Sequence, residues 1–520
     1  MNRDGADQPD DDTRRLLERM PASSDQDPIP VRVWAMRFAV PAAVGSLFGL
    51  DIGLSSGAVR ALGDAGLGAA QLGAVASASL FGALVSSALA LRFGDSLGRA
   101  RELRLAALLF VVGAALQAVA PLDISTESAS LAGSGPLLAA RAVYGLGIGF
   151  GMHAAPLYIA ESTPKQLRGL LLSAKEAAIV TGILLGYISS AVFGPNLPVD
   201  VSWRAMFASA EAIAVPVLVL SAFLPESPRW LCLKSVQTGN SSSSGGGGGG
   251  GGEDENPTNN TFAVRAREGF IQLYDGNVAE ADKNMQLVMD TLRDAEQPKV
   301  PGQGSFSLGD LVATKSARTS LVIGLGLVLF QQITGQPSVL YYANRIFAEA
   351  GGGFEFAVGV GVFKLVMTLG SAFAVDRVGR RTLLMTGTTG MAVCLLVLSA
   401  AFHGTPSSGA LSTSQQIVIA LGVLGYVGSY QIGFGPCTWL VLSEIFPIRI
   451  RSSALGLGTL TNFGSNLVVA SVFEAQRQAL GSSGLFGLFA VIALLAVAFE
   501  YSFVIETKGL SLEEIERKIT

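Results

Sequence analysis

The chain has 520 residues, of which 50% are hydrophobic and 15% are charged, and its formal net charge is −4. A soluble chain of this length would divide into several domains with charged surfaces, and this small negative charge gives no basic field for nucleic acid. The apolar residues gather instead in blocks of about twenty, the length that crosses the hydrocarbon core of a bilayer, so the composition predicts a polytopic membrane protein.

Residues 1–31 form a polar, acidic segment with no apolar core, which is neither a secretory signal nor an Arg-rich transit peptide. Asp12, Leu16 and Leu17 form a D-x-x-x-L-L pattern that resembles the acidic dileucine signal read by vesicle-coat adaptors. Six-residue patterns also arise by chance, so a sorting signal and a chance match are both open. A sorting signal predicts that replacing both leucines with alanine moves the protein toward the plasma membrane.

Twelve apolar segments follow in two sets of six. They lie at about 34–57, 68–93, 102–121, 135–160, 170–193 and 203–224, and at about 317–346, 354–376, 382–403, 414–443, 452–473 and 482–505. Between the sets, a Ser/Gly-rich run at 241–252 predicts a flexible coil, and residues 262–297 have helical periodicity. The chain thus divides into a tail (1–31), a first half (32–224), a central loop (225–316), a second half (317–505) and a tail (506–520).

The two halves are copies of one unit. The motif E-x-x-P-x-x-x-R occurs at 161–168 and 444–451, D-x-x-G-R occurs at 95–99 and 376–380, and an acidic cluster closes each half at Glu226 and Glu506. The copies are offset by 283, 281 and 280 residues, in the same order. Three motifs at matching offsets indicate an internal duplication.

Basic residues in the short loops fall mainly on one side of the predicted membrane. That side holds Arg92, Arg99, Arg101, Arg104, Lys165, Arg168, Arg377, Arg380, Arg381, Arg449 and Arg451, and the other side holds Arg60, Arg345 and Arg477. Because Lys and Arg are enriched in cytosolic loops, both tails and the central loop are predicted to be cytosolic.

The sequence gives no sign of an enzyme. Cys232, Cys394 and Cys437 lie in or beside apolar segments, which argues against a disulfide framework. The sequence has no nucleotide-binding loop, no metal-ligand cluster and no nucleophile with a base at usable spacing. The glycines of residues 145–151 lie inside an apolar segment, which excludes a dinucleotide fold. We therefore expect no catalytic residue, no cofactor and no metal.

Seven motifs carry a family resemblance. They are Asp95–Arg101, Pro156–Gly169, Pro225–Arg229, Gln331–Gly335, Asp376–Arg381, Gly435–Pro447 and Glu506–Gly509. With these motifs in order, the sequence resembles the sugar porter family of the major facilitator superfamily over essentially its whole length. Lys175–Glu176 and Gln331–Tyr342 are most similar to plant-type vacuolar glucose and D-xylose-proton symporter-like transporters. The resemblance implies an all-α membrane protein with the major facilitator fold, in which 12 transmembrane helices form two six-helix pseudo-repeats around a central cavity.

The resemblance also implies a sugar site. Residues matching the family's sugar-contacting positions are Gln331, Gln332, Trp439 and Asn462, and Tyr341, with Tyr342 beside it, could form a lid over the sugar. Amide groups and an aromatic plane suit sugar hydroxyls and ring faces.

Three positions of the expected site depart from the family pattern. Glu176 stands where the family commonly has Gln, and Lys364 and Pro337 stand where it has Asn. We expect Glu176 and Lys364 to face the same cavity and to form an ion pair across the two halves. Removing one partner alone should then cost more than restoring amides at both positions.

Charged residues at helix ends have two compatible interpretations. They are Asp95, Arg99, Glu161, Arg168, Asp376, Arg380, Glu444 and Arg451. They could pair at helix ends and set the topology, or they could form salt bridges between the halves that make and break as a cytosolic gate closes and opens. Family resemblance favours the gate.

Asp51 lies inside the first apolar segment, where burial disfavours the charged carboxylate. The resemblance places Arg141 beside it, as in the family's proton-coupled members, so that small movements of Arg141 could load or release a proton. A permanent structural pair is the alternative. His153 lies among small residues of the fourth segment, where packing or a backbone hydrogen bond is favoured over a proton relay.

The leading function is a secondary-active transporter of hexoses or pentoses, proton-coupled, working by alternating access. A facilitative sugar or polyol uniporter and a sugar sensor with the same fold are the alternatives. The expected partners are a small sugar, a proton and the lipid bilayer, with no nucleic acid, and the chain is expected to be a monomer. The vacuole or another endomembrane is favoured, with the plasma membrane and the plastid envelope as alternatives.

Overall fold

The computed structural model describes residues 31–122, 131–163, 165–243, 261–274, 276–296, 314–349, 352–403, 412–446, 451–508, 515 and 518. The first half contains α2 (Val31–Asp64), α3 (Ala69–Leu97), α4 (Arg99–Val119), η1 (Leu131–Ser134), α5 (Gly135–Ser162), α6 (Lys165–Phe193), α7 (Val199–Ala208) and α8 (Glu211–Ala222). The central loop contains α9 (Pro228–Ser243), α10 (Thr261–Leu273) and α11 (Val278–Glu296). The second half contains α12 (Lys315–Ile333), α13 (Gln336–Tyr341), α14 (Ala343–Glu349), α15 (Glu355–Val378), α16 (Arg380–Ala401), α17 (Thr413–Ile432), α18 (Phe434–Ile445) and α19 (Arg451–Phe503). The predicted dileucine pattern lies outside the described residues.

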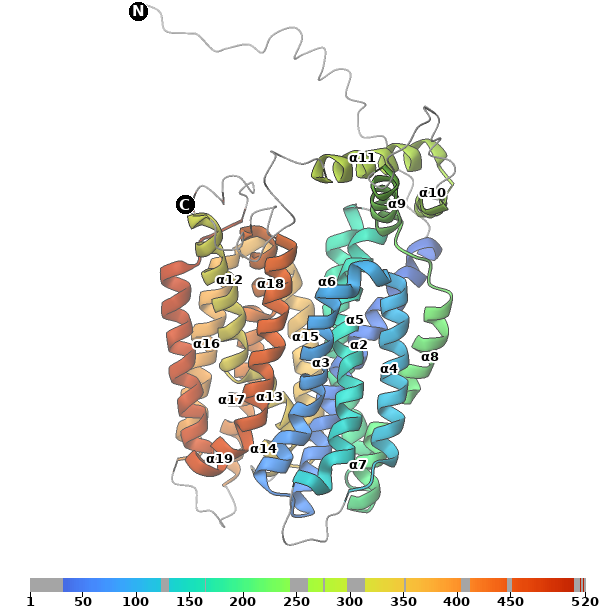
Figure 1. Cartoon of the computed structure of the whole chain (residues 1–520). Helices are drawn as coiled ribbons and strands as arrows, with labels where there is room; N and C mark the ends of the chain where they lie inside the picture. The colour runs from blue at the N-terminus through green and yellow to red at the C-terminus, as the bar shows by residue number, and fades with distance from the viewer. Residues whose placement is uncertain are drawn as a thin grey trace, which may run out of the picture.

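The two halves form two helical bundles that lie side by side (Figure 1). Among the described residues, ten helices are long and apolar enough to cross a membrane. The last of these is two helices joined at a kink at Gly481, and α15 runs beside the others as a further spanning helix (Figure 1). The predicted twelve-helix major facilitator fold is thus confirmed. We call the face that carries α9–α11 the terminal face and the other one the opposite face.

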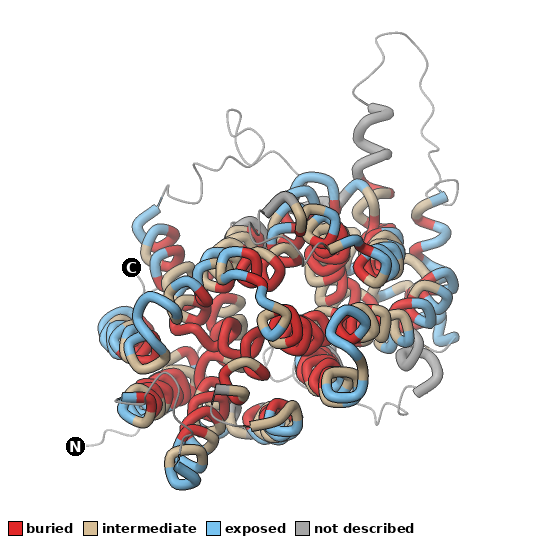
Figure 2. Tube along the Cα trace, turned by 90° about the horizontal axis from the view of Figure 1, so that it is seen from below, coloured by how far each residue is buried: buried red, intermediate tan, exposed pale blue. Residues whose placement is uncertain are grey.

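Apolar side chains cover the outside of the bundles. Figure 2 shows buried residues on the inward surfaces of the helices and exposed residues around the periphery. Large apolar side chains on the periphery include Val119, Leu421 and Phe81, which are 74%, 62% and 54% exposed. Because lipid tails solvate such side chains, this surface fits the interior of a bilayer.

Glycines allow the helices around the centre to touch. A methyl group on Gly49 of α2 would collide with the carbonyl oxygen of Ile179 on α6, and one on Gly182 of α6 would collide with that of Ser46. Small residues permit this close approach of membrane helices. The backbone of α2 is therefore held against α6 in the turn that precedes Asp51.

Two spanning helices of the second half are interrupted near the centre. Helix α12 ends at Ile333, and α13 begins after Gly335, whose φ of +90° is a left-handed conformation. A methyl group there would also lie 2.5 Å from the ring of Phe489, so glycine is required for both reasons. Helix α17 likewise gives way to α18 at Gly433. These breaks free backbone groups beside the central region.

The acidic clusters that close the two halves cap equivalent helices. Glu226 accepts a hydrogen bond from the backbone N–H of Ala100 at the start of α4 (2.9 Å). Glu506 accepts from the backbone N–H groups of Arg380 (2.9 Å) and Arg381 (3.1 Å) at the start of α16. A carboxylate suits a helix N-terminus because it pairs with unsatisfied N–H groups and with the helix dipole. The sequence repeat at these positions therefore corresponds to a repeated cap.

The pKa values of the two capping carboxyl groups are shifted in opposite directions. Burial raises the pKa of Glu226, although backbone N–H groups and Arg104 work to lower it. Burial also acts to raise the pKa of Glu506, but backbone N–H groups outweigh it, so that the pKa lies below the ordinary value. Glu506 therefore stabilises the fold at pH values above the pKa that it has in the unfolded chain. This stabilisation is lost as the pH falls through the lower pKa that it has in the folded protein.

Replacing Glu506 with Gln should lower the free energy of unfolding at pH 7 by about 1 kcal/mol, because the cap loses its charge. Thermal unfolding of the purified protein in detergent would measure the loss. The difference from wild type should shrink near pH 4, because the contribution of the charged cap declines as the pH falls below the ordinary carboxyl pKa toward the lower pKa of the folded protein. The matched variant Glu226→Gln should lose less at pH 7, and equal losses at both pH values would contradict the assignment.

Candidate functional site

Two charged side chains lie at the centre of the first bundle. Asp51 on α2 is 2% exposed and Arg141 on α5 is fully buried, and Arg141 Nη1 lies 3.2 Å from Asp51 Oδ1. A second contact joins Arg141 Nη2 to Asp51 Oδ2 at 3.4 Å. The expected contact between these residues is confirmed. Because an unpaired ion is expensive inside a bilayer, each residue stabilises the charge on the other.

Neutral acceptors surround the Arg141 guanidinium. It donates to Ser55 Oγ (2.8 Å), Ser79 Oγ (3.0 Å), Gln117 Oε1 (3.2 Å) and the carbonyl oxygen of Val75. Ser79 Oγ also donates to the partner carboxylate at 2.7 Å. The guanidinium therefore keeps four acceptors for its five N–H groups when that carboxylate is neutralised, so separation of the ion pair leaves only one buried N–H group unpaired.

Three amide side chains meet where α12 ends. Gln332 Nε2 donates to Asn462 Oδ1 on α19, and Gln331 Nε2 donates to the carbonyl oxygen of Phe434 on α18 at 3.1 Å. Both glutamines are buried, and Gln332 Oε1 has no hydrogen-bond partner among the described residues. The structure thus brings together three residues predicted to bind sugar and offers an acceptor for a hydroxyl group.

The two aromatic residues predicted for the site lie on the interrupted helices. Trp439 of α18 is partly buried beside Gly458 of α19, where a methyl group would lie 4.0 Å from Trp439 Cζ3. Tyr341 of α13 is fully buried, and its hydroxyl has no partner among the described residues. Next to it, Leu340 accepts a hydrogen bond from Tyr187 of α6 at 2.9 Å, which joins the two halves.

The halves meet closely at the opposite face. The Ser56 hydroxyl oxygen of α2 accepts a hydrogen bond from the Asn344 backbone N–H on α14 at 2.9 Å. Arg60, one turn further along α2, lies over the ring of Phe354 at 4.2 Å and donates to the carbonyl oxygens of Asn344 and Gly352 at 3.5 Å each. These contacts tie α2 to the segments around α14, so the structure is closed at this face.

Sequence comparison shows which proteins share this arrangement. The profile of the family described as "Sugar (and other) transporter" matches residues 38–253 and 258–519. The chain belongs to this family. Membership places it among transporters and not among enzymes.

Relatives of this transporter align over most of its length. D-xylose-proton symporter-like 3, chloroplastic, of Arabidopsis thaliana is 40% identical over 93% of the chain and 82% of the relative. D-xylose-proton symporter-like 2 of the same plant is 38% identical over 92% of the chain and 90% of the relative. The inward-open structure of the xylose transporter XylE from E. coli is 27% identical and covers 94% of this chain and 99% of its own, with a TM-score of 0.72.

Four of the predicted gate residues form two ion pairs, and each pair lies within one half of the transporter. Arg99 Nε lies 3.3 Å from Glu161 Oε1 in the first half, and Arg380 Nη2 lies 3.2 Å from Glu444 Oε1 in the second. Their carboxylates also accept from Ser227 Oγ and Thr507 Oγ1, respectively. In this structure these pairs join helix ends and not the two halves.

The other four predicted gate residues are Asp95, Arg168, Asp376 and Arg451, and their side chains lie outside the described parts of the chain. Salt bridges between the halves are a prediction for the state in which the terminal face is closed.

The expected ion pair between Glu176 and Lys364 is wrong for this structure. Glu176 Oε1 lies 2.8 Å from the ammonium group of its neighbour Lys175, and the Glu176 side chain is 54% exposed. Lys364 is buried on α15, and its Nζ donates to Gln431 Oε1 of α17 at 2.6 Å and lies 5.2 Å from the ring centroid of Tyr430. Each charge is thus satisfied by a group on its own side of the interface, so that no bridge between the halves is needed.

Gln431 is the site residue that sequence reasoning missed. It accepts from Lys364 and donates through Nε2 to Thr368 Oγ1 at 2.7 Å. Its neighbour Tyr430 makes a side-chain hydrogen bond with Gln331, which connects this chain of contacts to the amide cluster. The available signal was a polar residue inside the apolar segment 414–443, just before the helix break at Gly433.

We expect a double-mutant cycle to couple Lys364 to Gln431 more strongly than to Glu176. Lys364→Asn leaves Gln431 Oε1 without its donor and should lower the free energy of unfolding by about 1–3 kcal/mol. Adding Gln431→Leu to Lys364→Asn should cost much less than Gln431→Leu costs alone, whereas adding Glu176→Gln should show a smaller coupling, because Glu176 is paired with Lys175. Thermal and denaturant unfolding in detergent would measure both cycles. Additivity with Gln431 would contradict the contact.

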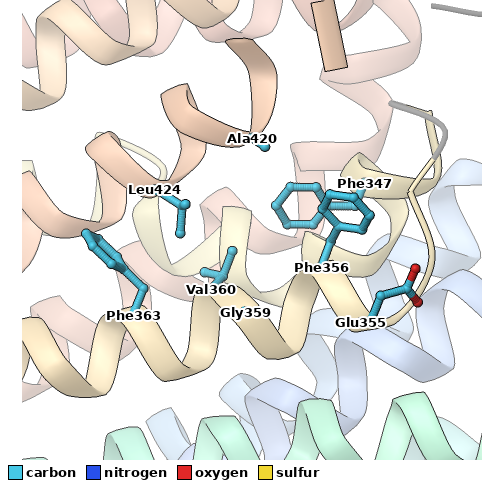
Figure 3. Close-up of a pocket in the computed structure, with 8 residues that line it drawn as sticks. All are labelled: Phe347, Glu355, Phe356, Gly359, Val360, Phe363, Ala420 and Leu424. Carbon is cyan, nitrogen blue, oxygen red and sulfur yellow. The ribbon is translucent and has the colours of Figure 1, made fainter. Parts of the chain in front are cut away.

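A cavity of about 380 Å³ lies away from these residues, between α14, α15 and α17 (Figure 3). It is lined by Phe347, Glu355, Phe356, Gly359, Val360, Phe363, Ala420 and Leu424. Its walls are almost wholly apolar, and none of the predicted sugar-binding residues lines it. This cavity is therefore separate from the candidate sugar site.

Proposed function

We propose that the chain is a proton-coupled sugar transporter that alternates between openings at its two faces. Family membership and relatives named as D-xylose-proton symporter-like support sugar transport. The observation that carries proton coupling is the buried pair of Asp51 and Arg141 in its shell of neutral acceptors. The shell lets Arg141 keep four neutral acceptors when the carboxylate no longer pairs with it.

The same helix connects the proposed proton site with the closed face. Asp51, Ser56 and Arg60 all lie on α2, and the last two contact the segments around α14 across the halves. Protonation of Asp51 removes its attraction to Arg141 and frees α2 to shift against α5. Such a shift alters the contacts of Ser56 and Arg60, so proton binding biases closure of the opposite face.

The proposed sugar site lies on the second half. Gln331, Gln332 and Asn462 would bind hydroxyl groups, and Trp439 would offer an apolar plane to the ring. Lys364 and Glu176 would adjust which hydroxyl pattern is accepted, since they place a donor and an acceptor where the family commonly has amides. Tyr341 would close over the sugar as α13 moves.

The decisive experiment measures transport in proteoliposomes. Purified protein is tested for counterflow of labelled xylose, glucose and myo-inositol, with and without an imposed pH gradient. Proton coupling predicts accumulation of one of the sugars above equilibrium only when the gradient is present. Equilibration without accumulation would indicate a facilitative uniporter. Sugar binding without counterflow would indicate a sensor.

We also propose that both tails and the central loop face the cytosol, because most basic residues of the short loops lie toward the terminal face. The sequence pattern at residues 12–17 favours the vacuole, whereas a relative that is named chloroplastic makes the plastid envelope the alternative. Imaging of a tagged full-length chain, with and without the Leu16→Ala/Leu17→Ala change, would distinguish the two.

A further inference from the structure

A carboxylate and an imidazole are paired inside the first half, away from Asp51 and Arg141. Glu102, in the first turn of α4, is fully buried, and its Oε1 lies 2.8 Å from Nδ1 of His153 on α5. The His153 side chain is 20% exposed. The sequence favoured packing or a backbone hydrogen bond for this histidine, but its partner is a buried acid.

One oxygen of this carboxylate is not satisfied. Glu102 Oε2 is buried and has no hydrogen-bond partner among the described residues. An ionised oxygen in this position is costly because it has lost water and gained no donor. A proton held by the pair removes this cost, either by charging the imidazole or by neutralising the carboxyl group.

The neighbouring charged groups have partners of their own. Glu161 pairs with Arg99, Arg104 donates to two backbone carbonyl oxygens before α9, and Arg37 of α2 donates to Gln272 of α10. The other titratable or charged groups on the packed helices toward this face are Arg92 on α3, Arg101 on α4, Tyr158 on α5, Lys175 and Glu176 on α6, Glu226 before α9, and Arg229 and Lys234 on α9. The side chains of Asp95, Lys165 and Arg168 lie outside the described residues.

We propose that Glu102 and His153 form a proton-binding site separate from the pair of Asp51 and Arg141. Arg141 and His153 are twelve residues apart on α5, about 18 Å along the helix axis, which is too far for direct proton transfer. The partly exposed imidazole gives this site its own access to water. The site does not depend on the proposed function, because proton binding can be measured without sugar.

The pair of Glu102 and His153 also contacts α3, a helix of the first half that packs against α19 of the second half. A methyl group on Gly94, near the end of α3, would lie 2.7 Å from His153 Cε1 and 3.3 Å from Glu102 Oε2. One turn earlier on α3, Leu91 packs against Gly456 of α19 in the other half. Loss of the proton leaves a net negative charge against this end of α3, so the protonation of the pair acts on a contact between the halves near the terminal face.

The chain offers an internal control, because His153 and His403 are its only two histidines. His403 is exposed near the opposite face, at the end of α16. The experiment labels histidine with ¹³C, records the imidazole NMR signals of the full-length protein in detergent over a pH series, and assigns the His153 signal with the variant His403→Asn. We expect the His153 midpoint to differ from that of His403 and to move by about one pH unit or more in Glu102→Gln.

Transport provides a second readout. The rate of sugar counterflow, measured with equal pH on both sides of the membrane, should show a titration step that Glu102→Gln removes and His403→Asn retains. Identical midpoints for the two histidines of the wild-type protein would overturn the proposal, and so would a His153 midpoint that stays unchanged in Glu102→Gln. The comparison within the wild-type protein decides this even when a variant does not fold.

Discussion

Replacing Asp51 with Asn is expected to abolish sugar accumulation driven by a pH gradient while sugar counterflow continues. The amide resembles the protonated acid, and Arg141 keeps its neutral acceptors at Ser55, Ser79 and Gln117. The variant therefore mimics the proton-loaded state permanently and can neither bind nor release a proton. Accumulation should fall to the equilibrium level in proteoliposomes with an imposed gradient.

The matched control for this variant is Asp64→Asn. Asp64 is exposed at the end of the same helix, so its replacement removes an equal charge without touching the buried pair. This control should accumulate sugar like the wild type. If Asp51→Asn still concentrates sugar under a pH gradient, the pair is a structural contact between α2 and α5, and coupling must be sought elsewhere in the chain.

Removal of Arg141 should be more damaging than removal of the acid. Arg141→Met leaves the Asp51 carboxylate buried with only the Ser79 hydroxyl as a donor. Breaking a buried ion pair from one side typically costs 3–5 kcal/mol, because a charge is left uncompensated. The asymmetry follows from the shell, in which the neutral groups are acceptors for the guanidinium and offer little to the carboxylate.

The architecture could be predicted from the sequence because its causes are local. The length of each apolar segment is set by the thickness of the bilayer, and the repeat of Glu226 at Glu506 and of residues 161–168 at 444–451 reveals the duplication directly. The helix break after Gln331 and Gln332 was not predicted, although Gly335 marks it. The sequence alone does not show that the ring of Phe489 packs against that glycine and leaves no room for a side chain.

The partners of the buried charged side chains were harder to predict from the sequence than the fold. The approach of Asp51 to Arg141 came from family resemblance, whereas Lys364 was assigned to the wrong partner. Residues on different helices meet only when both helices have the required rotation and depth, and the hydrophobic pattern of a spanning helix determines neither precisely. A helix that is apolar all round gives little indication of which face is buried.

The sequence also does not show which of the two faces is open and which is closed. The motifs that contain Arg99, Glu161, Arg380 and Glu444 read the same in every conformation, so they do not tell which face is closed. The structure resolves this through contacts outside the motifs, such as that between Ser56 and Asn344. The repeated motifs within each half instead form equivalent helix-end pairs.

The second large effect is expected at the amide cluster. Replacing Gln332 with Ala should raise the sugar concentration for half-maximal counterflow roughly ten- to a hundredfold, because a site built to bind a hydroxyl group loses an acceptor that nothing replaces. Gln332 Oε1 has no partner among the described residues, so the amide contributes little to folding through that atom. The variant also loses the hydrogen bond from Gln332 Nε2 to the partly exposed Asn462, so the unfolding temperature should fall modestly.

Gln331 provides the contrast within the same motif. Its Nε2 donates to the Phe434 carbonyl oxygen just after the helix break, so Gln331→Ala leaves a buried backbone acceptor unpaired. This variant should lose stability as well as transport, by about 1–3 kcal/mol. The exposed amide of Asn196 near the opposite face is the control, and Asn196→Ala should change neither property. A Gln332→Ala variant with wild-type sugar affinity would show that the amide cluster only holds α12 against α19, and the sugar would then have to bind elsewhere in the central region.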